Sequence, residues 1–244
     1  MRVLIVGDLH GHVYELARFL ESGADLALQV GDFGYWPRAQ WVAKRLHSLV
    51  GEKGLPFPVH FCDGNHEDHH ALNNLRWGGK YGAPRPEGWN DPPRAYRVAP
   101  GVFWQSRGST LTLPDGRVVL FVGGAWSVDW SRRRDGVSWF KKEEILSEWD
   151  YARFPDVHVD IVVSHTSPHL FGKWEPPSDL PFKVLPDPSQ DVLDKVFEKY
   201  RPSLWFFGHF HRRRSGEVDG CKWQSLGAMD GSADRFSDGC FVLE

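Results

Sequence analysis

The chain has 244 residues, of which 41% are hydrophobic and 25% charged, and this is ordinary globular usage rather than that of a disordered or coiled-coil chain. Its 29 Lys and Arg residues against 32 Asp and Glu residues give a net charge of −3, too close to neutral for binding nucleic acid by overall electrostatics. The longest aliphatic and aromatic run, residues 118–122, is far shorter than the roughly 20 residues that a membrane-spanning helix needs.

Short apolar runs that end in Gly, Asp or Ser recur along the chain and have the length of buried strands. They predict strands at residues 3–6, 26–30, 59–61, 118–122, 161–163 and 204–207. Amphipathic patterns between several of these runs predict helices at residues 13–21, 37–49, 143–154 and 189–200. Strands that alternate with helices are typical of a layered α/β fold. Because no break in composition divides the chain, we expect a single domain over residues 1–244.

Two stretches rich in Pro and Gly interrupt this alternation. Residues 78–100 are expected to form a long irregular excursion, and residues 174–188 either a pocket wall or an exposed connection. The apolar start of the chain runs into Asp8 after four residues, unlike a secretory signal. The three cysteines, Cys62, Cys221 and Cys240, lack the close pairing of a disulfide framework or a zinc knuckle. We therefore expect a cytoplasmic protein in which Cys62 is a buried, inert thiol.

Five of the predicted strands end in polar residues that can bind a metal ion. The segments are Gly7-Asp8-Leu9-His10, Gly31-Asp32, Gly64-Asn65-His66-Glu67, Ser164-His165 and Gly208-His209-Phe210-His211. Ligands bind at the carboxyl ends of strands in α/β sheets, and residues i and i+2 of an extended segment point to the same side. The glycines allow sharp turns and close approach of the backbone.

These segments supply seven nitrogen and oxygen ligands, too many for one tetrahedral ion but suited to two ions that share a carboxylate. A donor set without thiolate favours Mn²⁺, Fe or Zn²⁺. Two such ions roughly 3.5–4 Å apart can activate a water molecule for in-line displacement at phosphorus. The pattern therefore predicts phosphoester hydrolysis.

The motifs, which span Asp8 to His211, resemble those of the calcineurin-like metallophosphoesterase superfamily, and residues 123–129 resemble a stretch of its small bacterial and phage members. The resemblance implies a four-layer αββα sandwich with two mixed β-sheets and helices outside. It also implies one metal site formed by Asp8, His10, Asp32 and His211, and another formed by Asp32, Asn65, His165 and His209. His66 would be no ligand but would donate a proton to the leaving group, and the nucleophile would be a hydroxide that bridges two divalent ions.

The chain departs from the protein Ser/Thr phosphatase branch of this family, because Asp32 is followed by Phe33-Gly34-Tyr35 instead of Asp-Arg-Gly. This disfavours a phosphoprotein substrate and leaves His66 without that branch's acidic partner. We expect phosphodiesters or phosphomonoesters of small nucleotides, cyclic ones included, and no obligate nucleic-acid or membrane partner. A nuclease is one alternative. A non-catalytic binding module is another, although all seven ligand positions carry competent side chains.

Several residues beside the motifs have two interpretations. Asp63 and Glu67 either orient the ligands or, for Glu67, cap the following helix. The basic runs at residues 132–134 and 212–214, and Arg38, are either solvated or bind a substrate phosphate. Trp36, Trp126 and Trp130 either belong to the core or stack on a base.

Overall fold

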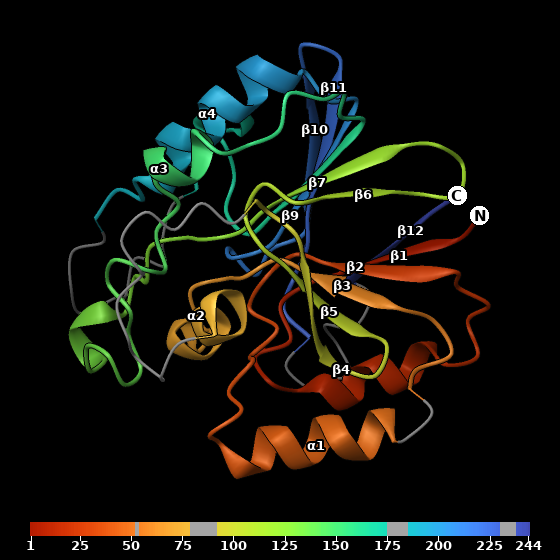
Figure 1. The fold of residues 1–244 in the computed structure, drawn as a ribbon. Helices are drawn as coiled ribbons and strands as arrows, with labels where there is room; N and C mark the ends of the chain where they lie inside the picture. Colours follow the sequence, from red (N-terminus) through yellow and green to blue (C-terminus); the bar gives the residue numbers. More distant parts are fainter. Residues whose placement is uncertain (52–53, 79–91, 175–184, 230–237) are drawn as a thin grey trace.

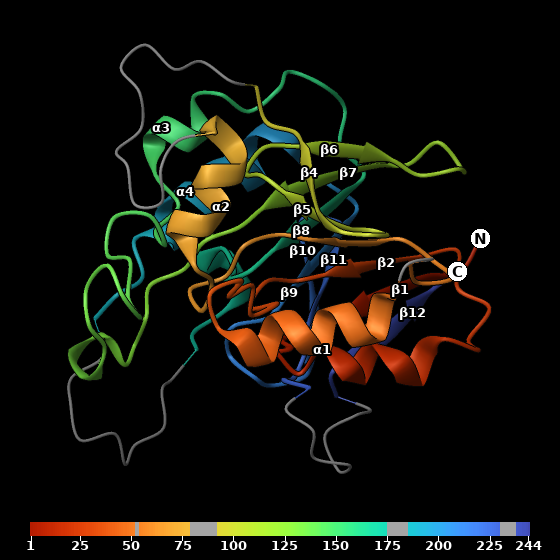
Figure 2. The same ribbon diagram turned by 60° about the horizontal axis from the view of Figure 1, so that its bottom comes forward.

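The computed structural model describes residues 1–51, 54–78, 92–174, 185–229 and 238–244. In this part of the chain two six-stranded β-sheets pack face to face, and helices cover their outer faces (Figures 1 and 2). Both termini lie at one end of the sheets, where β1 (Val3–Val6) starts and β12 (Cys240–Leu243) ends (Figure 1). The expected α/β sandwich with two mixed sheets is confirmed.

The first sheet has four parallel strands between two antiparallel edge strands. Its order is β12, β1, β2 (Leu26–Gln29), β3 (Val59–Phe61), β5 (Val102–Gln105) and β4 (Ala95–Ala99). The strands β1, β2, β3 and β5 are parallel, whereas β12 and β4 are antiparallel to their neighbours.

The edge strand β4 corrects the sequence prediction, because it lies within residues 78–100, where an irregular excursion was expected. The prolines that flank it, Pro92 and Pro93 before it and Pro100 after it, lie outside the strand and so remove no hydrogen bond from its ladder. Tyr96 of β4 also stacks on Trp104 of β5, with ring centroids 5.3 Å apart. The rest of that prediction, at residues 79–91, lies outside the described residues, as does most of the 174–188 stretch.

The second sheet repeats the arrangement of the first. Its order is β10 (Arg214–Val218), β11 (Cys221–Ser225), β9 (Leu204–Phe207), β8 (Ile161–Ser164), β7 (Val118–Val122) and β6 (Thr110–Thr112). Only the edge strands β10 and β6 are antiparallel to their neighbours. Each of the six strands predicted from apolar runs is present within one residue of its expected bounds.

The first strand shows why these runs lack polar alternation. Val3 and Ile5 belong to the core between the two sheets, whereas Leu4 and Val6 belong to the core beneath the outer helices. Because successive side chains of a strand point to opposite faces, a strand covered on both faces is apolar throughout.

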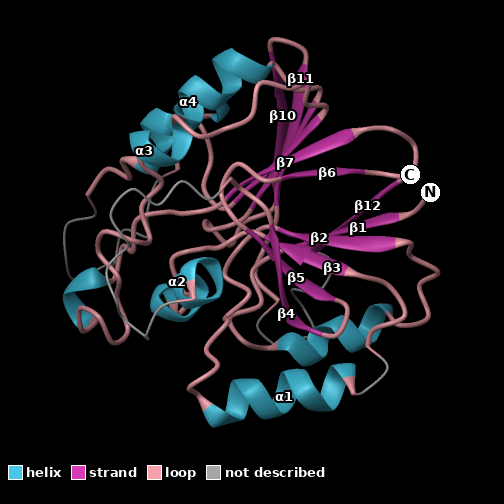
Figure 3. Cartoon of the chain, in the orientation of Figure 1, coloured by secondary structure: helices cyan, strands magenta, loops and turns pink. Residues whose placement is uncertain are grey.

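The helices lie outside the two sheets (Figure 3). Those over the first sheet are the 3-10 helix η1 (Val13–Phe19) and α1 (Gln40–Val50). Those over the second sheet are α3 (Glu148–Tyr151), η3 (His169–Phe171) and α4 (Ser189–Tyr200). Of the two remaining helices, α2 (His69–Trp77) lies beside the strand ends in Figure 3, and the other is the short 3-10 helix η2 (Trp130–Arg132). Within the described ranges, no helix combines the length and apolarity needed to cross a lipid bilayer.

Two predicted helices are corrected by the structure. The segment at residues 13–21 forms the tighter helix η1, in which the Glu15 N–H donates to the His12 carbonyl three residues earlier. The helix expected at residues 143–154 is limited to α3. The carbonyls of residues 143–145 accept hydrogen bonds from the Arg107 guanidinium, and this tertiary contact holds the preceding segment in a non-helical course.

Candidate metal centre

All eight predicted site residues lie at the carboxyl ends of parallel strands. Five strands supply them: β1 (Asp8, His10), β2 (Asp32), β3 (Asn65, His66), β8 (His165) and β9 (His209, His211). The strands of both sheets converge near the middle of the molecule, beside α2 (Figure 3). The structure therefore brings together residues that are up to about 200 positions apart in the chain.

Four of these residues form a compact group, which we call the first cluster: Asp8, His10, Asp32 and His211. Their ligand atoms all lie within 4.8 Å of one another. His211 Nε2 is 3.1 Å from Asp8 Oδ2 and 3.0 Å from His10 Nε2. His10 Nδ1 is 3.7 Å from Asp32 Oδ2. This spacing suits one metal ion bound by two imidazoles and two carboxylates.

The other predicted ligands form a second cluster around the other oxygen of Asp32: Asp32, Asn65, His165 and His209. Asn65 Oδ1 is 2.9 Å from His165 Nε2 and 3.0 Å from His209 Nδ1. His165 Nε2 is also 3.4 Å from Asp32 Oδ1. Asp32 thus presents one oxygen to each cluster, the arrangement required of a carboxylate shared by two ions.

The backbone is strained where it presents these ligands. Among the described residues, six that are not glycine have a positive φ, and four of them are His10 (45°), Asp32 (51°), His209 (66°) and His211 (51°). Such a conformation costs roughly 1–3 kcal/mol per residue, and it persists only where the surrounding structure imposes it. Its concentration at these positions is typical of a functional site.

Two motif glycines are required because a carboxylate occupies the space of a side chain. A Cβ atom at Gly64 would overlap the Asp32 carboxylate, and one at Gly208 would overlap the Asp8 carboxylate. The close approach of the backbone allows the His66 N–H to donate to Asp32 Oδ1 at 2.7 Å, and the His209 N–H to donate to Asp8 Oδ2 at 3.0 Å. The glycines therefore let the backbone itself orient both carboxylates.

The site has too many acceptors for the donors that it contains. His165 Nδ1 lies 2.9 Å from the Val30 carbonyl and donates to it, which leaves the Nε2 lone pair facing Asn65 Oδ1 and Asp32 Oδ1. Asp8 Oδ1 is buried and has no hydrogen-bond partner among the residues that the structure describes. A positive charge between these atoms would offset the repulsion of their lone pairs and the cost of burying an unpaired carboxylate oxygen. The nitrogen and oxygen donors fit a divalent Mn, Fe or Zn ion in that role.

The pKa values express the same demand for positive charge. Burial acts to lower the pKa of His165, but the charges of Asp32 and Asp8 raise it to about 10. Burial acts to raise the pKa of Asp32, yet the surrounding histidines, His165 foremost, hold it well below its usual range. In the absence of a metal, a proton on His165 supplies the charge that a cation would provide.

His66 lies beside the clusters rather than within them. Its ring packs edge-on against His10 with centroids 4.8 Å apart, and Trp36 Nε1 donates to its carbonyl at 2.7 Å. The Arg133 guanidinium contacts the His66 ring nitrogens. Burial lowers the pKa of His66 to about 4, and Arg133 also lowers it, against the opposing charge of Asp32. The ring is therefore neutral in this conformation.

Of the residues beside the motifs, Glu67 holds a loop of the site in place, whereas two tryptophans pack against a third. Glu67 accepts hydrogen bonds from the Phe33 and Tyr35 N–H groups at 2.8 and 2.6 Å, so it fixes the loop after Asp32. It does not cap α2, because the cap is Asp68, which accepts from the Ala71 N–H at 3.1 Å. The rings of Trp126 and Trp130 both pack against Trp139, which favours the core interpretation for those two tryptophans.

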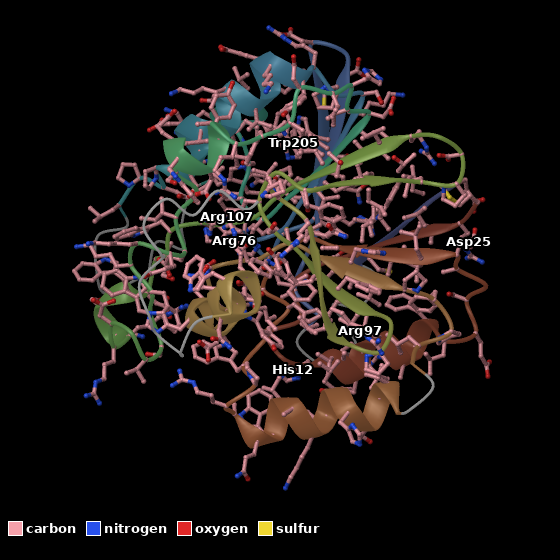
Figure 4. The ribbon with its side chains drawn as sticks, viewed as in Figure 1. His12, Asp25, Arg76, Arg97, Arg107 and Trp205 are labelled. Atoms are coloured by element: carbon pink, nitrogen blue, oxygen red, sulfur yellow. The ribbon has the colours of Figure 1, made fainter. Side chains whose placement is uncertain are left out.

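The sequence analysis gave no role to the supports behind Asn65, although one of them, Ser127, lies in the stretch 123–129 that resembles small family members. Arg107 is buried and pairs with Asp63 at 2.7 Å and with Asp150 at 3.3 Å. In Figure 4 it lies between α2 and α3. It borders a cavity of about 500 Å³ that none of the eight predicted site residues lines. Ser127 and Glu144 were also missed, and they connect to Asn65 through hydrogen bonds.

Two facing mixed sheets with a His and Asp cluster at the ends of their parallel strands define an α/β protein built to bind metal. Residues 1–213 match the calcineurin-like phosphoesterase family. The chain belongs to this family of metal-dependent phosphoesterases. No curated protein sequence matches the chain at a significant level.

Several solved structures are similar in fold. An archaeal phosphodiesterase aligns over 100% of this chain and 99% of its own, with 12% identity and a TM-score of 0.44. Vps29 of Entamoeba histolytica in complex with zinc aligns over 100% of this chain and 86% of its own, with 12% identity and a TM-score of 0.40. GAP50 of Plasmodium, the anchor in the inner membrane complex, aligns over 93% and 71%, with 15% identity and a TM-score of 0.49.

Proposed function

We propose that the protein is a phosphoesterase that uses two divalent metal ions to hydrolyse phosphodiester or phosphomonoester bonds of small nucleotides, including cyclic ones. The observation that carries the proposal is the convergence of seven nitrogen and oxygen ligands, with lone pairs facing one another, on the two oxygens of one buried carboxylate. Family membership supports the same chemistry.

In this proposal one ion is held by the first cluster and the other by the second, and Asp32 is shared. When bound, the ions would lower the pKa of a water molecule and neutralise charge on the phosphate oxygens. Because the ligands come from both sheets, residues 1–244 act as one domain. A cytoplasmic location and the absence of a nucleic-acid or membrane partner remain predictions from the sequence.

His66 would donate the proton that the leaving-group oxygen takes up when the P–O bond breaks. Its position against His10, outside both clusters, supports this role. A phosphate anion beside the ring would raise its pKa, since opposite charge favours the imidazolium. Positioned acid catalysis of this kind contributes roughly 10²–10⁴-fold in rate.

Arg133 is the arginine that we propose to bind the substrate phosphate. It donates to the Asn65 carbonyl at 3.2 Å and pairs with Asp129 at 2.7 Å, and these contacts hold its guanidinium beside His66. A phosphate is a better partner for a guanidinium than a neutral imidazole is, because two parallel charge-assisted hydrogen bonds can form. Binding of substrate would then free the His66 nitrogen to carry a proton.

The test is to supply metal-free protein with Mn²⁺, Fe²⁺ or Zn²⁺, count bound ions by mass spectrometry, and measure turnover of bis-p-nitrophenyl phosphate and cyclic nucleotides. We expect two ions per chain and metal-dependent turnover. Cleavage of DNA or RNA with steep salt sensitivity would instead favour a nuclease. Two bound ions without turnover of any ester would favour a binding module, and binding of at most one ion without turnover would refute the proposal.

A further inference from the structure

The amide of Asn65 has to point in one direction for the second cluster to bind a cation. Its oxygen and nitrogen have nearly the same shape, but only Oδ1 has lone pairs for a metal, whereas Nδ2 carries two protons. A rotation of the amide by half a turn would therefore replace a ligand by a donor at the same place. The residues behind Asn65 decide between the two orientations.

A buried hydrogen-bond chain runs from Asn65 away from the cluster. Asn65 Nδ2 lies 3.1 Å from Ser127 Oγ, and Ser127 Oγ lies 2.8 Å from Glu144 Oε2. The other carboxylate oxygen, Glu144 Oε1, accepts from the Ser127 N–H at 2.9 Å and from Trp139 Nε1 at 2.8 Å. Ser127 and Glu144 are both 0% exposed, so water cannot take the place of a missing partner.

Donor and acceptor counting gives this chain a direction. An ionised carboxylate only accepts, so the single hydroxyl proton of Ser127 is donated to Glu144. The Ser127 oxygen can then only accept from Asn65, and an accepting oxygen selects the amide NH₂. The amide oxygen is thereby left to face His165 and His209, as the structure has it.

We propose that Glu144 is a positioning residue that acts through Ser127 to fix the polarity of the Asn65 amide, so that Oδ1 and not Nδ2 faces the second cluster. The metal-binding part of this inference rests on the proposed function, whereas the orientation of the amide does not.

The segment that carries Glu144 is anchored independently of Asn65. Arg107 Nη2 donates to the carbonyls of Glu143 and Glu144 at 2.7 and 3.1 Å, and Nη1 donates to the Ile145 carbonyl at 2.6 Å. The Ala125 N–H donates to the Glu144 carbonyl at 2.9 Å and holds the Ser127 segment against it. The carboxylate is thus a fixed reference for the amide rather than one that follows it.

The decisive variant is Glu144→Gln, which keeps the shape and reverses the polarity. Two N–H donors converge on Oε1, so the new amide oxygen stays there and its NH₂ faces Ser127 Oγ. Ser127 then has to donate to Asn65, whose oxygen turns away from the cluster. We expect binding of the second Zn²⁺ ion to weaken about 10- to 100-fold, the range for residues that orient ligands.

The substitution Asn65→Asp in the Glu144→Gln background distinguishes polarity from general damage. There Ser127 accepts from the new amide NH₂ and is free to donate, so a carboxylate at position 65 accepts from Ser127 and still presents an oxygen to the cation. The double variant Glu144→Gln/Asn65→Asp, which has the net charge of the parent, should therefore bind the second ion more tightly than Glu144→Gln alone. Glu143→Gln, the same change one residue earlier, is the matched control and should leave both ions bound.

Zn²⁺ titration calorimetry at pH 8.5 measures these affinities, because burial raises the pKa of Glu144 to about 7 and the higher pH keeps it ionised. Wild-type affinity for the second ion in Glu144→Gln would overturn the proposal. A loss that persists undiminished in the double variant would also overturn it, since a structural defect does not depend on the group at position 65.

A second measurement needs no metal. In the metal-free protein, proton NMR should show contacts from the Asn65 side-chain NH₂ to the Ser127 β-protons, and in Glu144→Gln contacts to the His209 ring instead. Unchanged contacts in Glu144→Gln would refute the assigned polarity. If the contacts change as expected but the wild type binds no second ion, the proposed function fails while the orienting role of Glu144 stands.

Discussion

The two clusters that share Asp32 differ in how their ligands are held. In the first cluster the rings of His10 and His211 are 21% and 41% exposed, and their closest contacts are with each other and with the carboxylates. In the second cluster His165 is fully buried and donates to the Val30 carbonyl, and Asn65 is tied to Ser127. The second cluster is therefore oriented before a cation arrives, whereas the first depends on the course of its backbone.

This difference indicates that the two clusters would bind their ions with different affinities. A preorganised site binds tightly because folding has already met the cost of ordering its ligands. A site with exposed ligands exchanges its ion more readily. We expect the second cluster to hold a resident ion and the first to be filled in the presence of substrate or excess metal.

The largest expected effect comes from removing the residue that the clusters share. Asp32→Ala should lose both ions and lower turnover by at least about 10³-fold, because the ions contribute several kcal/mol to stabilising the transition state. Metal content and bis-p-nitrophenyl phosphate turnover measure this. Asp25→Ala is the control, since Asp25 is exposed and lies far from the site, near the chain termini (Figure 4). Two tightly bound ions in Asp32→Ala would contradict the shared role.

A smaller effect is expected where neither cluster is touched. His66→Ala should keep both ions and lower turnover of esters with poor leaving groups by roughly 10²–10⁴-fold. Esters of p-nitrophenol should be affected much less, because that leaving group needs no proton. Steady-state kinetics on an alkyl and a nitrophenyl ester of the same phosphate test this. Equal losses on both esters would exclude an acid role.

A third prediction concerns the buried ion pair between Arg107 and Asp63, which lies behind the second cluster. Arg107→Met leaves the buried Asp63 carboxylate without its partner, and we expect a loss of about 3–5 kcal/mol in the free energy of unfolding. Denaturant unfolding of the metal-free protein measures it. A loss below about 1 kcal/mol would mean that the ion pair is replaced by other contacts.

The pH dependence of that loss has a definite sign. In the wild type, burial acts to raise the pKa of Asp63, but Arg107 holds it below its usual value, so this stabilisation is present above about pH 4 and is lost at lower pH. In Arg107→Met, burial without the guanidinium raises the pKa of Asp63, and protonation then removes the penalty. The difference in unfolding free energy between the two proteins should therefore shrink as the pH falls from 8 to 5.

The smallest expected effect is a difference in the rates at which the two clusters release their ions. When the protein loaded with Zn²⁺ is mixed with excess chelator, the two ions should leave in separate phases that differ about tenfold or more in rate, since residues that orient ligands are worth 10- to 100-fold. His211→Ala should remove the fast phase and keep the slow one. Loss of the slow phase in His211→Ala would reverse the assignment.

The sequence predicted the eight site residues and the strands that carry them because both signals are local. A run such as residues 3–6, followed by Gly and Asp, specifies a buried strand and what stands at its end within a few positions. Parallel pairing then brings the ends together without further information from the side chains. The metal-binding roles of these residues stay predictions until ions are counted.

The parts that the sequence did not predict depend on tertiary contacts. Residues 143–147 have a helical pattern, but the Arg107 guanidinium, from a loop about 40 positions away, donates hydrogen bonds to the carbonyls of residues 143–145. Ser127 and Glu144 look like any hydroxyl and carboxylate in the sequence, and only burial beside Asn65 gives them a role. Tertiary contacts of this kind produce no periodic pattern in the sequence, so they could not be predicted from it.

The left-handed backbone at four predicted ligand positions lowers the stability of the fold, so selection for stability and selection for metal binding would favour different residues there. Glycine adopts that conformation without penalty, so a chain selected for thermal resistance alone would replace the imidazoles at positions 10, 209 and 211 by glycine. That histidines occupy so unfavourable a conformation is what we expect if they bind the proposed ions. Stabilising designs on this scaffold should therefore leave the rims of β1, β2 and β9 untouched and draw their gains from the outer helices.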